Sequence, residues 1–227
     1  AIAAAQEKKE NVRLRLIFQS PQIVSLPWEF LYDEDTNIFL ANNTETVLSR
    51  YIDVPLQKRD IKSASLPLKV LLVISTPTNL AKLDVAGEEK LIREALGKHI
   101  EAGNIELDVL QEATIRNVLH FIGHGVFENN QGFIALEDNN GKSQLLDDER
   151  FANFFLGNSN VGLVVLNSCQ GAAVGSNQVF AGTAPNLVRR GIPAVVAMQY
   201  SIFDNTAKIF ADEFYRTLSL GYPVDEA

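Results

Sequence analysis

The stretch LKVLLVI at Leu68–Ile74 decides the fold class, because six of its seven residues are apolar and no polar face is left. A short apolar run of this kind predicts a strand that is buried on both faces, as the strands of parallel sheets are. Four further segments fit the same sheet. Two of them, Val161–Leu166 and Ile192–Met198, are equally apolar. A weaker candidate is Val118–Ile122, and Ile105–Val109 alternates between apolar and polar residues like an edge strand.

Apolar residues at helical spacing lie between and after these strands. The three groups are Leu91, Ile92, Ala95 and Leu96 after Glu88-Glu89; Ala184, Leu187 and Val188 before Gly191; and Phe203, Ala207, Phe210, Phe214 and Leu218 before Gly221. A glycine suits the end of a helix. Strands that alternate with helices predict an α/β fold whose mostly parallel central sheet is covered by helices on both faces.

A β-hairpin is expected to leave the main sheet. The turn residues Asp138–Gly141 separate the apolar segment Phe133–Leu136 from Gln144–Leu146. An Asn-Gly pair between two such segments is typical of a tight hairpin turn. We therefore predict two short antiparallel strands there.

The first sixty residues differ from the rest in their hydrophobic pattern. Their short apolar segments are Leu14–Phe18, Leu26–Tyr32 and Val47–Tyr51, which predict short strands and a helical turn packed against the main sheet. A chain of 227 residues suits one sizeable domain. We expect a single domain over residues 1–227, with 1–60 as an N-terminal packing segment and 66–227 as the core.

One connection is short for a parallel sheet. Only Gln111–Asn117 separate the strand at Ile105–Val109 from the strand at Val118–Ile122. A crossover between parallel neighbours takes about a dozen residues or more. Either these two strands are not neighbours, or the sequence omits a segment between them.

Composition limits the possible partners. The net charge is -8 and no run of lysines or arginines occurs, which argues against nucleic acid as the main partner. No apolar stretch approaches the roughly 20 residues that cross a bilayer, so we expect no membrane partner. The one cysteine cannot form an internal disulfide, and we expect a cytoplasmic location. The chain begins without Met, and we expect it to be part of a longer protein.

Two loops that follow predicted strands carry reactive side chains. His124 lies between Gly123 and Gly125, and Cys169, the only cysteine, is followed by Gly171 two residues on. Reactive groups of a parallel sheet gather where the strands end. A cysteine nucleophile needs an imidazole that accepts its proton and main-chain donors that stabilise the oxyanion. We expect Cys169 as nucleophile, His124 as general base, and the N–H groups of Gly125 and Cys169 as the oxyanion hole.

The alternatives at these positions are structural. Cys169 could be a buried thiol, since free cysteine is among the most buried residue types, and His124 could be a hydrogen-bonded histidine at a strand end. His120 lies ~13 Å from His124 along an extended strand, too far for a shared metal, and is expected in the core or supporting the site. His99 is expected on the solvated surface.

Other catalytic templates do not fit. Asn140–Ser143 resembles the end of a phosphate-binding loop, but Leu136 stands where that loop needs its first glycine. The sequence contains no Gly-x-Ser-x-Gly, Cys-x-x-Cys or His-Glu-x-x-His motif. We expect no metal and no cofactor.

Five segments in order resemble the CHAT domain family, which comprises caspase-like cysteine peptidases related to separase and, more distantly, to caspases and gingipains. The segments are Leu26–Glu29, Arg50-Tyr51, Val118–Gly125, Leu166–Gly171 and Gly191–Gln199. In caspases a histidine stands about 50 residues before a Cys-[RQG]-Gly core. Here His124 and Cys169 are 45 residues apart (169 − 124) and Cys169-Gln170-Gly171 fits, although Asn167-Ser168 differ from the caspase Gln-Ala. The short Gln111–Asn117 link departs from the family, whose members carry a helix there.

The resemblance implies a caspase-like sandwich with a His124–Cys169 dyad that needs no third member. It also implies that a substrate adds as an extended strand beside Met198, Gln199, Tyr200 and Ser201. Asp204 would meet a basic P1 side chain of the substrate, or it is simply the N-cap of the following helix.

The function expected from these residues is limited endoproteolysis of a protein substrate. Family members are often fused to helical repeats, so a regulatory protein or helical-repeat domain is a possible further partner. One alternative is a non-catalytic caspase-like scaffold in signalling. Another is a transferase that passes the acyl group of the acyl-enzyme to an amine.

Overall fold

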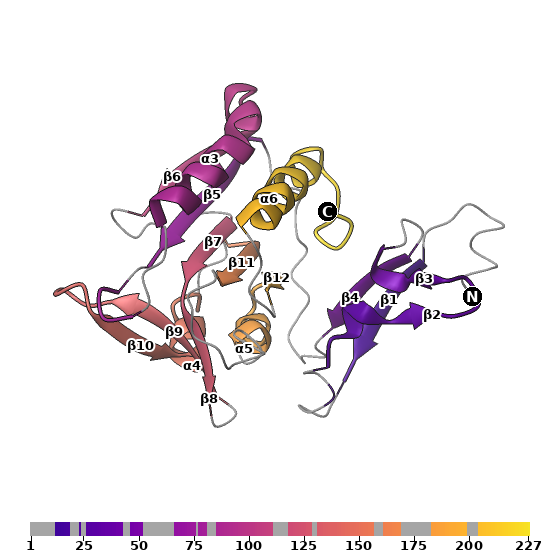
Figure 1. Cartoon of the computed structure of the whole chain (residues 1–227), viewed down its shortest axis with the longest axis horizontal. Coiled ribbons are helices and arrows are strands. Elements are labelled where there is room, and N and C mark those ends of the chain that lie inside the picture. The colour runs from indigo at the N-terminus through magenta and orange to yellow at the C-terminus, as the bar shows by residue number, and fades with distance from the viewer. Residues whose placement is uncertain are drawn as a thin grey trace. The chain divides into compact units, whose positions relative to one another are not determined.

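A computed structural model describes residues 12–18, 23, 26–42, 46–51, 66–75, 77–80, 85–110, 118–128, 131–156, 161–168, 183–198 and 204–227 (Figure 1). Contacts divide the chain into two compact units. The first comprises Ala1–Pro55 with Pro223–Glu226, and the second comprises Leu56–Tyr222 with Ala227. The single domain expected from the sequence stays a prediction.

The second unit is built on a five-stranded sheet of order β12-β11-β7-β5-β6, in which every pair of neighbours is parallel. Its strands are β5 (Leu68–Ile74), β6 (Ile105–Val109), β7 (Val118–Gly123), β11 (Leu163–Ser168) and β12 (Ala194–Ala197). All five predicted strands are confirmed, with β6 at an edge. β5 lies between β6 and β7, so these two strands are not neighbours, and the Gln111–Asn117 link between them lies outside the described residues.

Helices cover both faces of this sheet. On one face, Phe121, Val164 and Leu166 share a buried cluster with Phe151 of α4 (Asp148–Asn153) and Leu187 of α5 (Thr183–Arg189). Successive side chains of a strand point to opposite faces. Accordingly His120 points to the other face, where it contacts Tyr215 of α6 (Asp204–Ser219).

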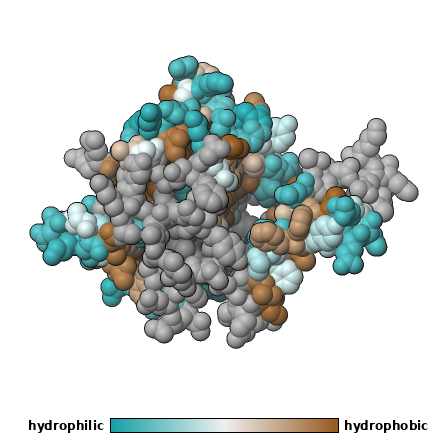
Figure 2. Space-filling model, viewed as in Figure 1, coloured by the Kyte–Doolittle hydropathy of each residue, from teal (hydrophilic) through white to brown (hydrophobic). Residues whose placement is uncertain are grey.

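The helix α3 (Val85–Glu101) packs against α6. Its residues Ile92, Ala95 and Leu96 are buried, as their helical spacing predicts. Hydrophilic residues cover its outer side (Figure 2). The side chain of Lys90 in this helix is 75% exposed. The predicted mixed α/β fold with a parallel central sheet and flanking helices is confirmed. Phe203, which belonged to the predicted pattern of α6, lies outside the described residues.

A second sheet in the same unit contains the predicted hairpin. β9 (Gln131–Glu137) pairs antiparallel with β10 (Ser143–Asp147), which confirms it, and β8 (Gly125–Glu128) adds a third strand on the other side of β9. In the turn, Asp138 Oδ1 accepts hydrogen bonds from the main-chain N–H groups of Asn140 and Lys142. These bonds lower the pKa of the Asp138 carboxyl.

The first unit contains the expected short strands and helical turn. β1 (Val12–Ile17) and β4 (Thr46–Tyr51) form a parallel pair, and β2 (Tyr32–Asp33) and β3 (Ile38–Phe39) form an antiparallel pair. The helical turns are η1 (Trp28–Phe30) and η2 (Leu40–Asn42). The expected packing of this segment against the main sheet stays a prediction.

Side-chain contacts connect the parts of this unit. The ring of Trp28 stacks on Phe18 with centroids 4.5 Å apart, and Arg13 forms ion pairs with Asp225 and Glu226. Among the residues that the structure describes, no helix combines the length and the apolar character that crossing a membrane requires.

Candidate active site

His124 lies where β7 ends, and the glycine before it is required by packing. A Cβ atom on Gly123 would lie 2.6 Å from Cζ of Phe121 and 3.2 Å from the carbonyl oxygen of Ser75. The Phe121 ring is fully buried. A larger residue than glycine would therefore force the Phe121 ring or the main chain before His124 to move.

The main chain around His124 is held from two sides. The carbonyl oxygen of His124 accepts a hydrogen bond from the N–H of Ala135 in β9, at 3.0 Å. Two residues earlier, the carbonyl oxygen of Ile122 accepts one from the N–H of Ser75, also at 3.0 Å. The residue as a whole is half-buried. The main chain of His124 is thus bonded to β9, and that of the nearby Ile122 to the end of β5.

The register of β8 determines where the N–H of Gly125 points. Gly125 lies opposite Ile134, and the bond from Ala135 N to His124 O makes Gly125–Ile134 a non-hydrogen-bonded pair. The N–H of Gly125 therefore points away from β9. Because β8 is an edge strand in the described part of its sheet, this N–H is directed to the open edge.

The strand before the cysteine ends level with the strand before the histidine. β11 lies directly beside β7, with Asn167 opposite Ile122 and Ser168 opposite Gly123. Neighbouring strands are about 4.8 Å apart. Cys169 lies outside the described residues, but the two strands that lead to it and to His124 are adjacent, parallel and in register.

The expected substrate-binding segment is described only at its ends. Met198 follows the edge strand β12, is half-buried, and donates its N–H to the carbonyl oxygen of Leu166 at 3.0 Å. Gln199, Tyr200 and Ser201 lie outside the described residues. Asp204 is the first residue of α6, and its side chain is not among those described. The structure thus describes the positions of His124, Gly125 and Met198, and the roles of all the candidates stay predictions.

His120 is a core residue, one of the two positions expected for it. Its side chain is 2% exposed, and Nδ1 lies 2.8 Å from the hydroxyl oxygen of Tyr215. Burial lowers the pKa of His120 to about 4, so the imidazole is neutral at physiological pH. Among the described residues, its Nε2 and the nearby Asn167 Oδ1 are buried without a hydrogen-bond partner.

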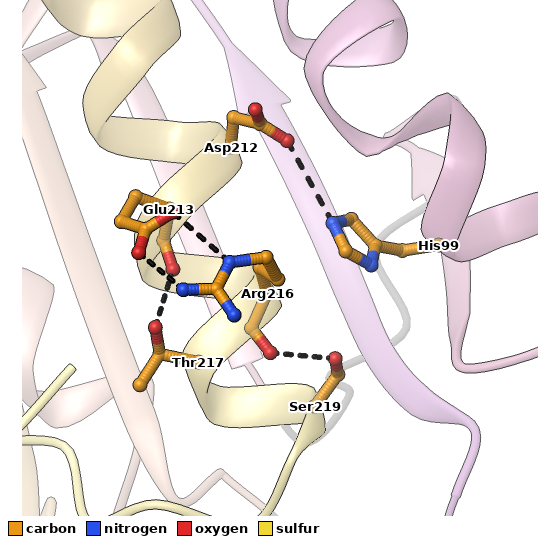
Figure 3. Close-up of polar contacts among 6 residues, drawn as sticks. All are labelled: His99, Asp212, Glu213, Arg216, Thr217 and Ser219. Atoms are coloured by element: carbon orange, nitrogen blue, oxygen red, sulfur yellow. Dashed lines mark hydrogen bonds and ion pairs between the residues drawn. The ribbon is translucent and has the colours of Figure 1, made fainter.

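His99 is not the solvated residue that the sequence predicts. Its side chain is only 14% exposed, and Nε2 lies 3.7 Å from Oδ1 of Asp212 on α6 (Figure 3). The reason is that α6 packs along α3 and covers this side of the helix. The local sequence around His99 could not predict this burial, because α6 lies more than 100 residues further along the chain.

The comparison with protein families decides the identity of the chain. A model of the CHAT domain matches residues 2–227. The chain belongs to the CHAT domain family. CHAT domains are a caspase-like family, and the parallel central sheet with its helices is consistent with a caspase-like fold. A comparison with curated proteins found no match.

Two of the motif segments of this CHAT domain meet in the structure. The carboxylate of Glu29 accepts hydrogen bonds from Nε and Nη2 of Arg50, at 2.9 and 2.5 Å. This bidentate pair ties the helical turn η1 to strand β4. The ion pair therefore links the Leu26–Glu29 segment to the Arg50-Tyr51 segment, which explains structurally why both are present.

Sequence reasoning missed one buried polar residue beside the site of the CHAT domain. Ser75 follows β5, is 3% exposed, and contacts both Ile122 and Ala135. The available signal was a serine directly after the most apolar strand, where parallel sheets place functional residues. Within the described residues, no group of three or more His, Cys, Asp or Glu side chains could hold a metal ion.

Proposed function

We propose that this CHAT domain is a cysteine endopeptidase that performs limited proteolysis of a protein substrate with Cys169 and His124. The observation that carries the proposal is the register of β11 and β7, which ends the strands before both residues side by side. A nucleophile and its base must lie within hydrogen-bond reach, and side chains that follow adjacent strand ends about 4.8 Å apart are compatible with this requirement.

The proposed reaction has two steps. His124 accepts the Sγ–H proton of Cys169, and the thiolate sulfur bonds to the scissile carbonyl carbon. The tetrahedral intermediate collapses, the amine leaves with the proton from His124, and a thioester remains on Cys169. His124 then removes a proton from water, which attacks the thioester and releases the carboxylic acid and the free thiol.

The oxyanion of each intermediate needs preorganised donors. The N–H of Gly125 supports this role because the register of β8 directs it away from β9. The N–H of Cys169 is the second proposed donor. Removing one oxyanion donor costs about 10²–10³ in rate in other hydrolases, so this pair would supply a large part of the catalysis.

The substrate is proposed to add as a strand beside β12. Met198 N–H bonds to β11, and successive residues of a strand direct their main-chain groups to opposite sides, so Val195 and Ala197 direct theirs to the other side of β12. That side is an edge in the described part of the sheet. An extended peptide can pair with such an edge and continue along Met198, Gln199, Tyr200 and Ser201. Asp204 is proposed to meet a basic P1 side chain.

We further propose a cytoplasmic protein whose activity is controlled by a regulatory protein or a fused helical-repeat domain. In that case the isolated chain cleaves slowly, and the activator raises turnover without changing the cleavage site.

Cleavage of a diverse peptide library, read by mass spectrometry, tests the peptidase. Cys169→Ala and His124→Ala should each lower cleavage by at least about 10³-fold, while His99→Ala on α3 serves as the histidine control and keeps it. Cleavage that persists in Cys169→Ala would contradict the proposal. Basic residues at P1 would support the role of Asp204, and apolar ones would remove it.

Alkylation of the thiol tests the Cys169–His124 pair without a substrate. Cys169 is the only cysteine of the chain, so iodoacetamide reports on it alone. A thiolate held by an imidazolium reacts well below the ordinary thiol pKa of about 8.5, and His124→Ala should restore the ordinary pH profile. An ordinary profile in the unmodified protein, together with no cleavage, would instead indicate a non-catalytic scaffold.

A further inference from the structure

Ser75 connects the two sheets that meet at His124. It follows β5 directly, and its side chain is 3% exposed. Its main-chain N–H donates to the carbonyl oxygen of Ile122 in β7 at 3.0 Å, and its hydroxyl donates to the carbonyl oxygen of Ala135 in β9 at 2.8 Å. One residue therefore bonds to a strand of each sheet.

Both strands to which Ser75 bonds position the proposed base: β7 precedes it in the chain, and β9 bonds to its main chain. Ile122 is two residues before His124, and Ala135 donates its own N–H to the carbonyl oxygen of His124 at 3.0 Å. A Cβ atom on Gly123 would lie 3.2 Å from the Ser75 carbonyl oxygen, so the main chain between Ile122 and His124 passes against Ser75.

The loop after Ser75 holds the far end of the same hairpin. The N–H and hydroxyl of Thr78 both donate to the carbonyl oxygen of Gly141 in the hairpin turn, at 2.8 and 2.9 Å. Asn79 exchanges two hydrogen bonds with Ser143 at the start of β10. These contacts fix the hairpin at its turn, while the Ser75 hydroxyl fixes it beside His124.

We propose that Ser75 is a positioning residue, whose hydroxyl sets the place of β9 and thereby the orientation of His124 and of the Gly125 N–H. The inference rests on the proposed function, because that proposal makes His124 the general base and the Gly125 N–H an oxyanion donor. Without the hydroxyl, the Ala135 carbonyl oxygen loses a buried donor and β9 can shift against β7. A shift of about 1 Å at a catalytic group can cost about 10²-fold in rate.

The test compares Ser75→Ala with Thr78→Val. The control also removes a hydroxyl that bonds the hairpin, but the Gly141 carbonyl oxygen keeps the Thr78 N–H as donor. We expect Ser75→Ala to lower kcat by about 10- to 100-fold with a smaller change in KM, and Thr78→Val to leave both near the original values. A folded Ser75→Ala with unchanged kcat overturns the positioning role.

The pH profile of Cys169 alkylation gives a second readout that does not need a cleaved substrate. We expect Ser75→Ala to shift this profile towards that of His124→Ala, and Ser75→Thr, which keeps the hydroxyl, to shift it less than Ser75→Val. If Ser75→Ala does not fold, this Thr and Val pair of nearly equal volume provides the comparison.

The two proposals fail in different ways. If His124→Ala leaves the alkylation profile of the unmodified protein unchanged, the Cys169–His124 pair is absent and both proposals fall. If His124→Ala changes the profile but folded Ser75→Ala does not, only the role of Ser75 is overturned.

Discussion

The Nδ1 atom of His120 lies 2.8 Å from the hydroxyl oxygen of Tyr215, which is 95 residues further along the chain. His120 is 2% exposed and Tyr215 is fully buried. The pair joins the central strand β7 to helix α6 through a buried hydrogen bond. Burial lowers the pKa of His120 to about 4 and raises that of Tyr215 above its ordinary range, so both side chains are neutral at physiological pH.

The first prediction concerns stability against acid. His120 takes up its proton near pH 6.5 in the unfolded chain but only near pH 4 in the folded one, so between these values the unfolded chain binds more protons. The free energy of unfolding therefore falls as the pH drops, by about 2 kcal/mol between pH 7.5 and pH 5 from this residue. Urea unfolding at both pH values should show this loss, and His120→Gln should reduce it. An equal loss in both proteins would exclude His120 as the cause.

The second prediction concerns the hydroxyl of Tyr215. In Tyr215→Phe the Nδ1 of His120 loses its partner, and Nε2 already has none in the described part of the chain. A buried polar group left without a partner costs about 1–3 kcal/mol. Tyr222→Phe is the control, because Tyr222 is 54% exposed and its loss of a hydroxyl should leave the free energy of unfolding nearly unchanged. Equal stability of the two variants would contradict the importance of the buried hydrogen bond.

The strands were predictable from the sequence, but their order was not. Apolar runs such as Leu68–Ile74 identify buried strands because a strand covered on both faces leaves no polar side. They carry no information on which strand lies next to which, so the central place of β5 between β6 and β7 appears only in the structure. Strand β8 escaped prediction because it has four residues and follows directly on the glycine-rich end of β7.

For the candidate site, the sequence identifies residues whose roles stay predictions. Glycines on both sides of His124 mark it in the sequence, and packing explains the first of them. The role of Ser75 depends on contacts with residues 47 and 60 positions away (122 − 75 and 135 − 75), which no local pattern records. The burial of His99 has the same origin, since a distant helix covers it.

The third prediction concerns the ion pair of Glu29 and Arg50 in the first unit. The guanidinium binds both carboxylate oxygens, although the Glu29 side chain is 51% exposed. Exposed pairs contribute about 0.2–1 kcal/mol, and bidentate geometry favours the upper end. A double-mutant cycle with Glu29→Ala and Arg50→Ala should give a coupling near 1 kcal/mol that decreases with salt. The pair Glu89 and Arg93 on α3 is the comparison, with about 0.3–0.5 kcal/mol expected. A Glu29–Arg50 coupling no larger than this would argue against a structural role for the two motif segments.

The fourth prediction contrasts two glycines. In Gly123→Ala the added Cβ would lie 2.6 Å from a ring carbon of the fully buried Phe121 and 3.2 Å from the Ser75 carbonyl oxygen, so the ring or the main chain before His124 must move. Overpacking of this kind costs about 1–3 kcal/mol. Gly97→Ala is the control, because its Cβ would meet nothing within 4 Å inside helix α3 and should stabilise the protein by up to about 1 kcal/mol. Thermal unfolding of both variants measures the contrast. A Gly123→Ala protein as stable as Gly97→Ala would show that the main chain before His124 has room to move, and would weaken the argument that packing fixes this histidine.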